Sequence, residues 1–190
     1  MRNFFKIITS IKKLIALTVY YGLCRYLPAS SFFIGGSIFK WARFVCCKAI
    51  FQSCGTNVNI ERLAFFGSGR RLRIGDNSGL GKNCVVPSNV VIGKNVMMGP
   101  EVHILAANHK FDKTDIPMCQ QGHAEEKQTI IEDDIWIGRQ VLFTPGRKVS
   151  TGSIIAAGTV LTKDFPAYSI VGGNPAKLIK SRLESNNSIM

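Results

Sequence analysis

This 190-residue sequence contains three histidines, His103, His109 and His123. A histidine can take a proton from a hydroxyl group, which makes it a common general base in catalysis. His109 is the last residue of a regular repeat and directly precedes a long polar segment, so we expect it at an edge where it can point into a cleft. His103 comes one repeat earlier and is expected at the preceding corner. His109 is therefore the candidate catalytic residue.

The element that must position His109 is a six-residue repeat, which runs from Ile74 to Pro166 with one interruption. Each hexapeptide opens with an apolar residue, glycine often follows, and the fifth position is mostly small or β-branched. An amphipathic helix would repeat every three or four residues, and an antiparallel sandwich would alternate every two, so neither fits. The opening residues are Ile74, Leu80, Val86, Ile92, Met98, Ile104, Ile131, Ile137, Phe143, Val149, Ile155 and Leu161.

We interpret the repeat as short strands joined by tight corners, with three hexapeptides in each triangular coil of a parallel β-helix. The predicted fold class is therefore all-β. Cys84 falls at an inward fifth position, where a thiol behaves as a small apolar group. Residues eighteen positions apart should stack: Ile74 on Ile92, Leu80 on Met98, and Val86 on Ile104.

The chain is expected to divide near Phe51, with a basic, apolar, helical segment in residues 1–50 and the β-helix domain in residues 51–190. The first 60 residues contain eight basic residues and no acidic one, although the whole chain has a net charge of +12. One interpretation is a basic amphipathic helix on the anionic cytoplasmic leaflet of a membrane. The other is a helical cap over the open end of the β-helix, and the two do not exclude each other.

Other classes fit the N-terminal segment less well. Its longest uncharged run, from Leu14 to Cys24, is too short to span a bilayer, which needs roughly 20 apolar residues. The basic residues lie among aliphatic ones without a recognition module, which argues against nucleic acid as a partner. Six cysteines without CxxC spacing, and no cleavable signal peptide, indicate reduced thiols in a cytoplasmic protein.

The repeat is interrupted from Lys110 to Ile130 by a polar stretch that contains Pro117 and Gly122. A loop of this length in a regular solenoid is typically functional, because it must leave the stack at one corner. Beyond the repeat, Asn174 as N-cap and Pro175 as first helical residue predict a short basic C-terminal helix.

The sequence resembles the hexapeptide-repeat acyltransferases, in particular the branch of sugar and polysaccharide O-acetyltransferases that includes the maltose, galactoside and serine acetyltransferases. The resembling segments are IGDNSGLGKNC, VVIGKNVMMGPEVHILAANHKFD, IWIG, IIAAGTVLTKDFP and SIVGGNPAKLIKSR, within residues 54–182. The resemblance implies a left-handed β-helix and a homotrimer with active sites in the clefts between subunits. It also implies acetyl-CoA as the acetyl donor and no metal.

Site residues follow from the resemblance position by position. His109, in the AANH segment, matches the family's catalytic histidine, which takes the proton of a sugar hydroxyl as that oxygen attacks the acetyl carbonyl; backbone N–H groups stabilise the oxyanion. Trp136 in IWIG matches the active-site tryptophan, expected near the thioester or acceptor, unless it serves subunit packing. Asn108 is a candidate contact of the acceptor, although asparagine at a corner is as often a turn former.

Further matches are contacts with the coenzyme. Arg139 stands where relatives carry a small Ser or Ala that meets coenzyme A. The other matches are Ala157, Thr162 and Lys163 beside the pantetheine, and Lys177 and Lys180 beside the nucleotide phosphates, where ammonium groups suit the task unless they are only solvated.

The chain departs from the family pattern in two places. Where relatives read PGVTIG, this chain has PGRKVS, which puts Arg147 at an inward fifth position and Ser150 where glycine is usual. A charge inside a narrow coil is costly unless it is paired or turned outward, so we expect a local distortion. The extended apolar N-terminus is also unlike the short acceptor-binding segment of the maltose enzymes, which weakens the case for a small free sugar.

The expected function is therefore O-acetylation of a sugar hydroxyl in a polysaccharide (capsule, O-antigen or exopolysaccharide) or its lipid-linked precursor. A small soluble acceptor, such as a free sugar, a nucleotide amino sugar or serine, is the alternative. A β-helix carbonic anhydrase needs three histidines converging on zinc, and the spacing of His103 and His109 argues against it. A non-catalytic scaffold would not need a loop at a histidine.

Overall fold

A computed structural model describes the backbone of residues 2–184 and the side chains of residues 10–184. Its helices are α1 (Arg2–Gly22) and α2 (Gly36–Ile50), with short 3-10 turns η1 (Cys24–Tyr26) and η2 (Met118–Gln120). The strands are β1 (Ser53–Cys54), β2 (Asn59–Ile60), β3 (Arg73–Ile74), β4 (Gly79–Leu80), β5 (Val91–Ile92), β6 (Met97–Met98), β7 (His103–Ile104), β8 (Ile130–Ile131), β9 (Trp136–Ile137), β10 (Leu142–Phe143), β11 (Lys148–Val149), β12 (Ile154–Ile155), β13 (Val160–Leu161), β14 (Ser169–Gly172) and β15 (Lys177–Ser181).

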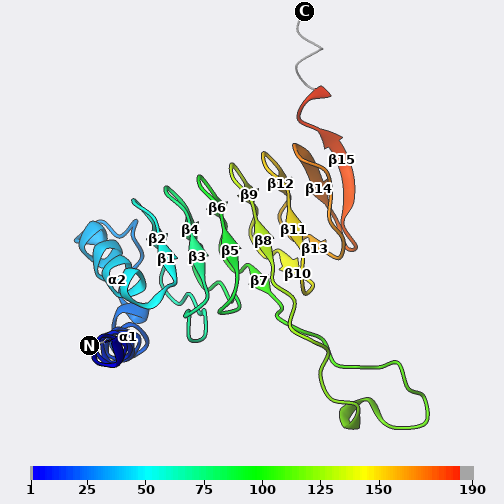
Figure 1. The fold of residues 1–190 in the computed structure, drawn as a ribbon. Coiled ribbons are helices and arrows are strands. Elements are labelled where there is room, and N and C mark those ends of the chain that lie inside the picture. The colour runs from blue at the N-terminus through cyan, green and yellow to red at the C-terminus, as the bar shows by residue number, and fades with distance from the viewer. Residues whose placement is uncertain (1, 185–190) are drawn as a thin grey trace, which may run out of the picture.

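The strands stack into the parallel β-helix that the repeat predicts (Figure 1). One face has the order β1-β3-β5-β8-β11, a second has β7-β10-β13, and a third runs from β6 through β9 and β12 to β14, with β2 and β4 continuing it toward the N-terminus. Ile74 pairs with Ile92, and Val85 bridges His103, which stacks Val86 on Ile104. The eighteen-residue register is therefore confirmed.

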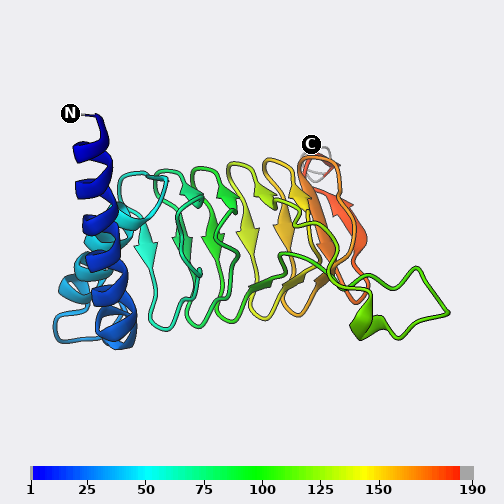
Figure 2. The same cartoon turned by 60° about the horizontal axis from the view of Figure 1, so that its bottom comes forward.

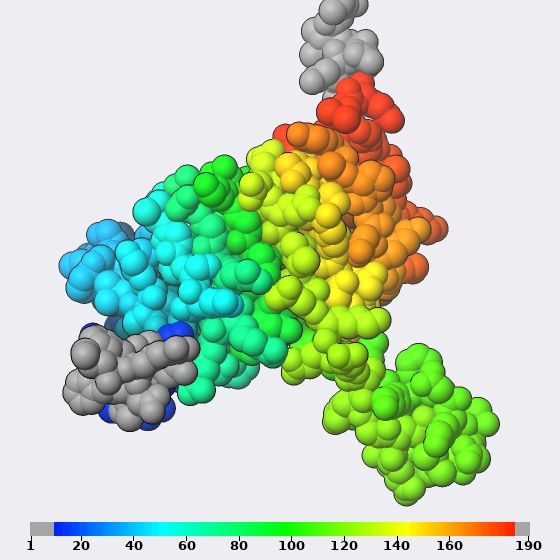
Figure 3. Space-filling model, in the orientation of Figure 1, coloured from blue at the N-terminus to red at the C-terminus, as the bar shows by residue number. Residues whose placement is uncertain are grey.

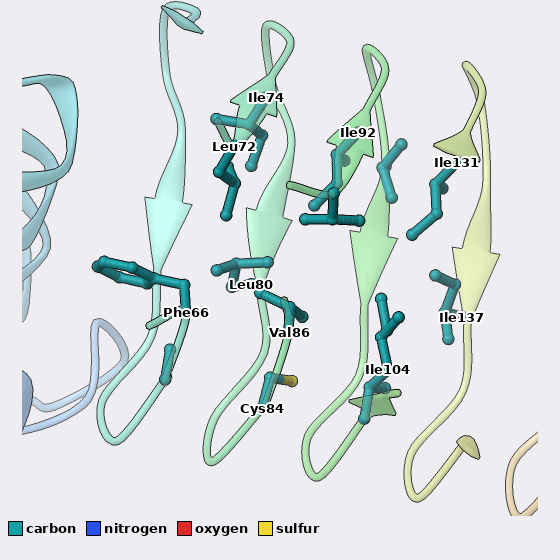
Figure 4. Close-up of a cluster of buried hydrophobic side chains, with 14 of the residues drawn as sticks. Phe66, Leu72, Ile74, Leu80, Cys84, Val86, Ile92, Ile104, Ile131 and Ile137 are labelled. Carbon is teal, nitrogen blue, oxygen red and sulfur yellow. The ribbon is translucent and has the colours of Figure 1, made fainter. Parts of the chain in front are cut away.

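The inward positions form one continuous apolar column (Figure 4). Every opening residue of the repeat is buried except Met98, which is partly buried. Cys84 points inward as expected, and its Sγ lies 3.3 Å from the carbonyl oxygen of Gly99. Burial raises the pKa of the Cys84 thiol to about 11, so this sulfur stays protonated and acts as a small core group.

Stacked corners leave no room for side chains where the coils meet. A Cβ on Gly81 would collide with the backbone carbonyl of Gly99 on the next coil. A neighbouring row of corners uses asparagine instead, because Asn77 and Asn95 adopt left-handed backbone conformations. The amide of Asn57 donates to Asn77 over 3.1 Å, and that of Asn77 to Asn95 over 3.3 Å, so the corners are also joined from coil to coil.

The helices close the N-terminal end of the β-helix (Figure 2). The hydroxyl of Tyr20, on α1, donates to the carbonyl of Ala64 over 2.9 Å. Arg43, on α2, is fully buried; its Nε donates to the carbonyl of Ile60 over 2.6 Å, and its guanidinium also reaches Glu61 at 3.8 Å. These contacts confirm the cap interpretation of the N-terminal segment for its described side chains.

The predicted interruption leaves the coils as a long loop. Strand β5 pairs directly with β8, so that Ile92 contacts Ile131 across the inserted residues. The loop extends away from the body (Figure 1) and forms a separate lobe in the space-filling view (Figure 3), with most of its side chains exposed. The side chain of Gln121 holds the lobe together, because it bonds both backbone groups of Lys113 and the carbonyl of Ile116.

The predicted C-terminal helix is wrong. The chain turns at Gly173–Ala176 and returns as β15, which pairs antiparallel with β14. β14 would otherwise leave an edge of unpaired backbone groups on the last coil, and a returning strand satisfies them where a helix would not. Ala176 is buried and donates its N–H to the carbonyl of Val160 over 2.9 Å, which fixes the turn against the coil.

The distortion expected at Arg147 is also wrong, because β11 keeps a regular register with β8. The guanidinium turns away from the core and is paired at the edge. It donates to the carbonyl of Thr162 over 2.9 Å and to that of Pro145 over 3.3 Å, and lies 3.5 Å from the carboxylate of Asp164. Turning outward thus avoids the cost of a buried charge without a change in the strand.

Candidate active site

His109 stands at the stem of the long loop, where the chain leaves the third coil. The stem is a single antiparallel bridge: Lys110 N–H donates to the carbonyl of Gly122 over 3.0 Å, and Ala124 N–H to that of Asn108 over 2.8 Å. These bonds hold His109 opposite His123, with the ring centroids 4.4 Å apart and the planes inclined by 38°. Both rings are exposed. His109 is thus held by local backbone pairing and stays open to a ligand.

Asn108 shares this stem. Its backbone carbonyl is used by Ala124, while its side chain is exposed. The predicted contact of Asn108 with an acceptor stays a prediction. His123 is the partner that sequence reasoning did not assign, because nothing in the six-residue register says that the two arms of an insertion pair at this point.

Trp136 lies on β9 and points outward, with 52% of its surface exposed. It pairs with Met97 on β6 and Ile154 on β12, and the row continues through Ile170 to Lys180 on β15. The structure therefore places Trp136 in an outward-facing apolar row that ends at a predicted phosphate-binding lysine. Met97, also exposed, was not singled out from the sequence, although its place one coil before Trp136 could have marked it.

Arg139 and Ala157 come together at one stacked corner. Gly158 N–H donates to the carbonyl of Arg139 over 2.9 Å, and the backbone of Ala157 passes directly against Gly138. The Arg139 guanidinium lies 3.5 Å from the Glu101 carboxylate; Arg139 is exposed and Glu101 partly exposed. Beside them is an open groove whose lining residues are Asn83, Glu101, His103, Gln140, Val141 and Leu142. The corner is accessible to a long ligand.

Thr162 and Lys163 follow β13 at the next corner. The Thr162 carbonyl is occupied by Arg147, and the ammonium group of Lys163 lies 5.4 Å from the centroid of the Phe165 ring. Lys177 is exposed on β15, opposite Gly172. The two lysines predicted for the phosphates thus lie on a strand at the C-terminal end of the β-helix, not on a helix.

The candidate residues form two groups within one chain. His109, Asn108 and His123 are on the loop stem, whereas Trp136, Arg139, Ala157 and the lysines follow the stacked coils toward the C-terminus. Across the part of the chain that the structure describes, no hydrogen bond or ion pair joins His109 to the second group. The same part contains no three His, Cys, Asp or Glu side chains placed to share a metal ion.

Fold and repeat define a hexapeptide-repeat protein, and comparisons with known proteins agree. The family model "Bacterial transferase hexapeptide (six repeats)" matches residues 72–106. The Saccharomyces cerevisiae protein named "Putative acetyltransferase YJL218W" is 34% identical to this chain over 143 residues. The match covers 74% of this chain and 71% of that protein. The chain therefore belongs to the hexapeptide-repeat acetyltransferase family.

Solved structures support the same fold. A maltose O-acetyltransferase from Clostridium difficile superposes with a TM-score of 0.71 at 26% identity, over 92% of this chain and 88% of that one. A Vibrio cholerae hexapeptide-repeat acetyltransferase, solved with acetyl coenzyme A, has a TM-score of 0.67 at 24% identity, over 93% and 87% of the two chains; this likeness is of the fold alone.

A shorter stretch is similar to chloramphenicol acetyltransferases. That of Agrobacterium fabrum is 39% identical over 66 residues, which are 35% of this chain and 32% of that protein. The match thus spans about a third of the relative's length, and it says nothing of the rest.

Proposed function

We propose that this protein transfers the acetyl group of acetyl-CoA to a hydroxyl of a sugar, in a polysaccharide or its lipid-linked precursor. The observation that carries the proposal is the position of His109: an exposed imidazole held at the stem of the loop, in a chain of the hexapeptide-repeat acetyltransferase family. A general base needs this combination of a fixed position and access to the acceptor.

The reaction requires no covalent enzyme intermediate. His109 takes the hydroxyl proton while the acceptor oxygen attacks the acetyl carbonyl. The C–O bond forms, the C–S bond of the thioester breaks, and the proton passes from the imidazole to the departing coenzyme thiolate. The protonated and neutral forms of a histidine are both accessible near neutral pH, so one residue can serve both steps.

The coenzyme is assigned to the second group of residues, on a neighbouring subunit of a homotrimer. In support, the corner of Arg139 and Ala157 is open, the outward-facing row beside it carries Trp136, and that row ends at Lys180. Among the described residues no hydrogen bond joins this group to His109, as expected for a site shared by two subunits.

The acceptor has one serious alternative, a small soluble molecule with a hydroxyl group. The maltose O-acetyltransferase and the chloramphenicol acetyltransferases act on acceptors of this size by their names. A polysaccharide acceptor is favoured here because His109 lies on an exposed stem.

The first test is release of free thiol from acetyl-CoA by the purified full-length protein, across nucleotide sugars, lipid-linked sugars, oligosaccharides and chloramphenicol. His109→Ala should lower the rate by about 10²- to 10⁴-fold, the usual contribution of a general base, with unchanged melting temperature. Lys113→Ala, an exposed change in the same loop, is the matched control and should retain activity. Activity of His109→Ala within a few-fold of wild type would show that another group is the base.

The shared site is tested by mixing two inactive variants. Ala157→Trp should block the coenzyme corner while folding normally, because Ala157 is exposed. Co-expressed with His109→Ala, it should regain activity, since some interfaces then pair an intact His109 with an intact Ala157. A monomeric wild type, or mixed oligomers that stay inactive, would place the whole site within one subunit.

A further inference from the structure

Both capping helices carry an apolar stripe that no other part of residues 10–184 covers. On α1 the exposed apolar side chains recur at Ile11, Leu14, Ile15 and Val19, and on α2 and the turn before it at Phe33, Ile34, Ile38, Trp41 and Val45. We call these nine residues the outer helical face. Phe33 is 85% exposed and Trp41 is 64% exposed, values that are unusual for side chains of this size.

Each stripe lies opposite the face with which its helix caps the first coil. On α1 the buried contacts come from Tyr20 and its helical neighbours, and at 3.6 residues per turn Ile11 and Ile15 lie on the other side. On α2 they come from Arg43 and Cys47, with Ile38 and Trp41 on the other side. Since both helices cover the same end of the β-helix, both stripes face away from it (Figure 2).

Charge around the outer helical face has one sign only. The first 60 residues contain no Asp or Glu, and the first acidic side chain, Glu61, is engaged with Arg43 inside the cap. Lys12 is exposed and Lys13 half-buried on α1, while on α2 Lys48 is exposed and Lys40 half-buried. Lys12 and Lys48 border the apolar stripes without an acidic neighbour from the same segment. The ammonium group of Lys40 instead donates to Asn57 on the first coil over 3.0 Å, and Lys13 lies on the Tyr20 side of α1.

We propose that the outer helical face binds the surface of an anionic membrane, with Trp41 at the headgroup region, Phe33 buried among the acyl chains, and Lys12 and Lys48 at the headgroups. Tryptophan favours the headgroup region because its ring is apolar and its N–H is polar, and each lysine near an anionic leaflet adds to the attraction. In the described part of the chain no helix is long and apolar enough to cross a bilayer, so the helices lie on the surface.

A second copy of the chain fits this surface less well, because two faces of the same positive charge would have to meet. The capping helices run across the end of the β-helix, and the long loop extends away from them (Figure 2). Bound in this way, the coils stand on the membrane, and the loop lies at a distance from it.

Vesicle flotation tests the binding. The wild type should float with phosphatidylcholine vesicles that contain phosphatidylglycerol, and much less with phosphatidylcholine alone. Phe33→Ser/Trp41→Ser should weaken binding by about tenfold or more through lost apolar burial. Lys12→Gln/Lys48→Gln should weaken it by about 30-fold at low salt.

Matched controls change the same chemistry elsewhere. Phe111→Ser/Met118→Ser removes exposed apolar groups from the loop, and Lys82→Gln/Lys113→Gln removes two exposed lysines; both should bind vesicles as the wild type does. Failure of the wild type to float, or equal losses in the controls, would overturn the proposal. The proposal would also be overturned if Phe33→Ser/Trp41→Ser dissociated a larger oligomer without weakening vesicle binding.

Tryptophan fluorescence gives a second measurement that does not depend on the double variants folding. The chain has two tryptophans, so Trp136→Phe leaves Trp41 as the single reporter. Anionic vesicles should shift its emission to the blue, and brominated lipids should quench it. An emission spectrum that vesicles leave unchanged would also overturn the proposal, because Trp41 would then remain in water.

Discussion

The coils and the loop are built on opposite plans from adjoining stretches of one chain. In the coils, an inward side chain such as Ile92 contacts residues from the coils before and after, Ile74 and Ile131. In the loop, the bonds of Gln121 reach no farther than Lys113, and most side chains face solvent. The packing of the coils therefore provides most of the stability of the molecule. The loop carries a reactive side chain that contributes little to that stability.

This difference shows where a reactive side chain can be placed in a solenoid. A side chain inside the apolar column cannot contact a ligand. A charged side chain at an inward position must turn outward, as Arg147 does. A side chain at the point where the chain departs is fixed by the coil on one side and exposed on the other. His109 occupies such a point, so changes there should affect the reaction and not the fold.

The largest effect is expected from a charge inside the column. Ile92→Asp should prevent folding, because a carboxylate would be buried between Ile74 and Ile131 without a partner. Circular dichroism and size-exclusion chromatography of the purified variant measure this. Phe111→Asp, an equal change on an exposed loop residue, should melt as the wild type does. A folded Ile92→Asp protein would remove the distinction between the two regions.

The second-largest effect tests whether the capping helices and the coils unfold together. Arg43→Ala should lower the free energy of unfolding by about 3–5 kcal/mol, because it leaves Glu61 and several backbone carbonyls without their buried partner. Urea denaturation measures the loss, with Lys48→Ala on the same helix as the control. If the two variants unfold alike, the cap is an appendage with its own stability.

Acid should weaken the same contact. Burial raises the pKa of Glu61, but hydrogen bonds from Ser30 and Asn59 outweigh it and hold this pKa below its usual range. The stabilisation is therefore present above the ordinary glutamate value of about 4.3 and is lost as pH falls through the lower value in the folded protein. Urea midpoints at a series of pH values should show this fall, and Glu61→Gln should flatten it. An equal slope in Glu61→Gln would assign the acid sensitivity to other carboxylates.

The smallest effect belongs to the loop. Gln121→Ala removes three side-chain hydrogen bonds and should destabilise the lobe by about 1 kcal/mol per bond at most, without a change in the melting temperature of the coils. Hydrogen exchange at the Lys113 amide should accelerate. Gln120→Ala, whose side chain is exposed and whose bond is through the backbone, is the control. A lower melting temperature for Gln121→Ala would mean that the lobe supports the column.

The sequence predicts the coils well because their register repeats a local rule at every step. Ile74, Ile92 and Ile131 can be aligned without a structure, and the start of the loop at His109 follows from the loss of that register. Arg43 could not be predicted, because its partners Leu27, Pro28 and Ile60 become neighbours only when the helices fold against the first coil. The pairing of His109 with His123 depends in the same way on how a flexible insertion closes.

The strand at the C-terminus was missed for a related reason. Asn174 and Pro175 carry the local signals of a helix start, but the unpaired edge of β14 is a property of the whole stack. Roles for Trp136, Arg139 and the lysines remain predictions from the resemblance.

The first and last coils of a parallel β-helix have strand edges with unpaired N–H and C=O groups. Another molecule could bind to these edges and extend the stack. Here the first coil is covered by helices, and along one side of the last coil the outermost strand, β15, runs against the direction of the rest and carries Lys177 and Lys180. A second molecule would meet reversed polarity and like charge on that side instead of a matching edge. A chain cut before Gly173 would instead present β14 there as a parallel edge that another molecule could extend.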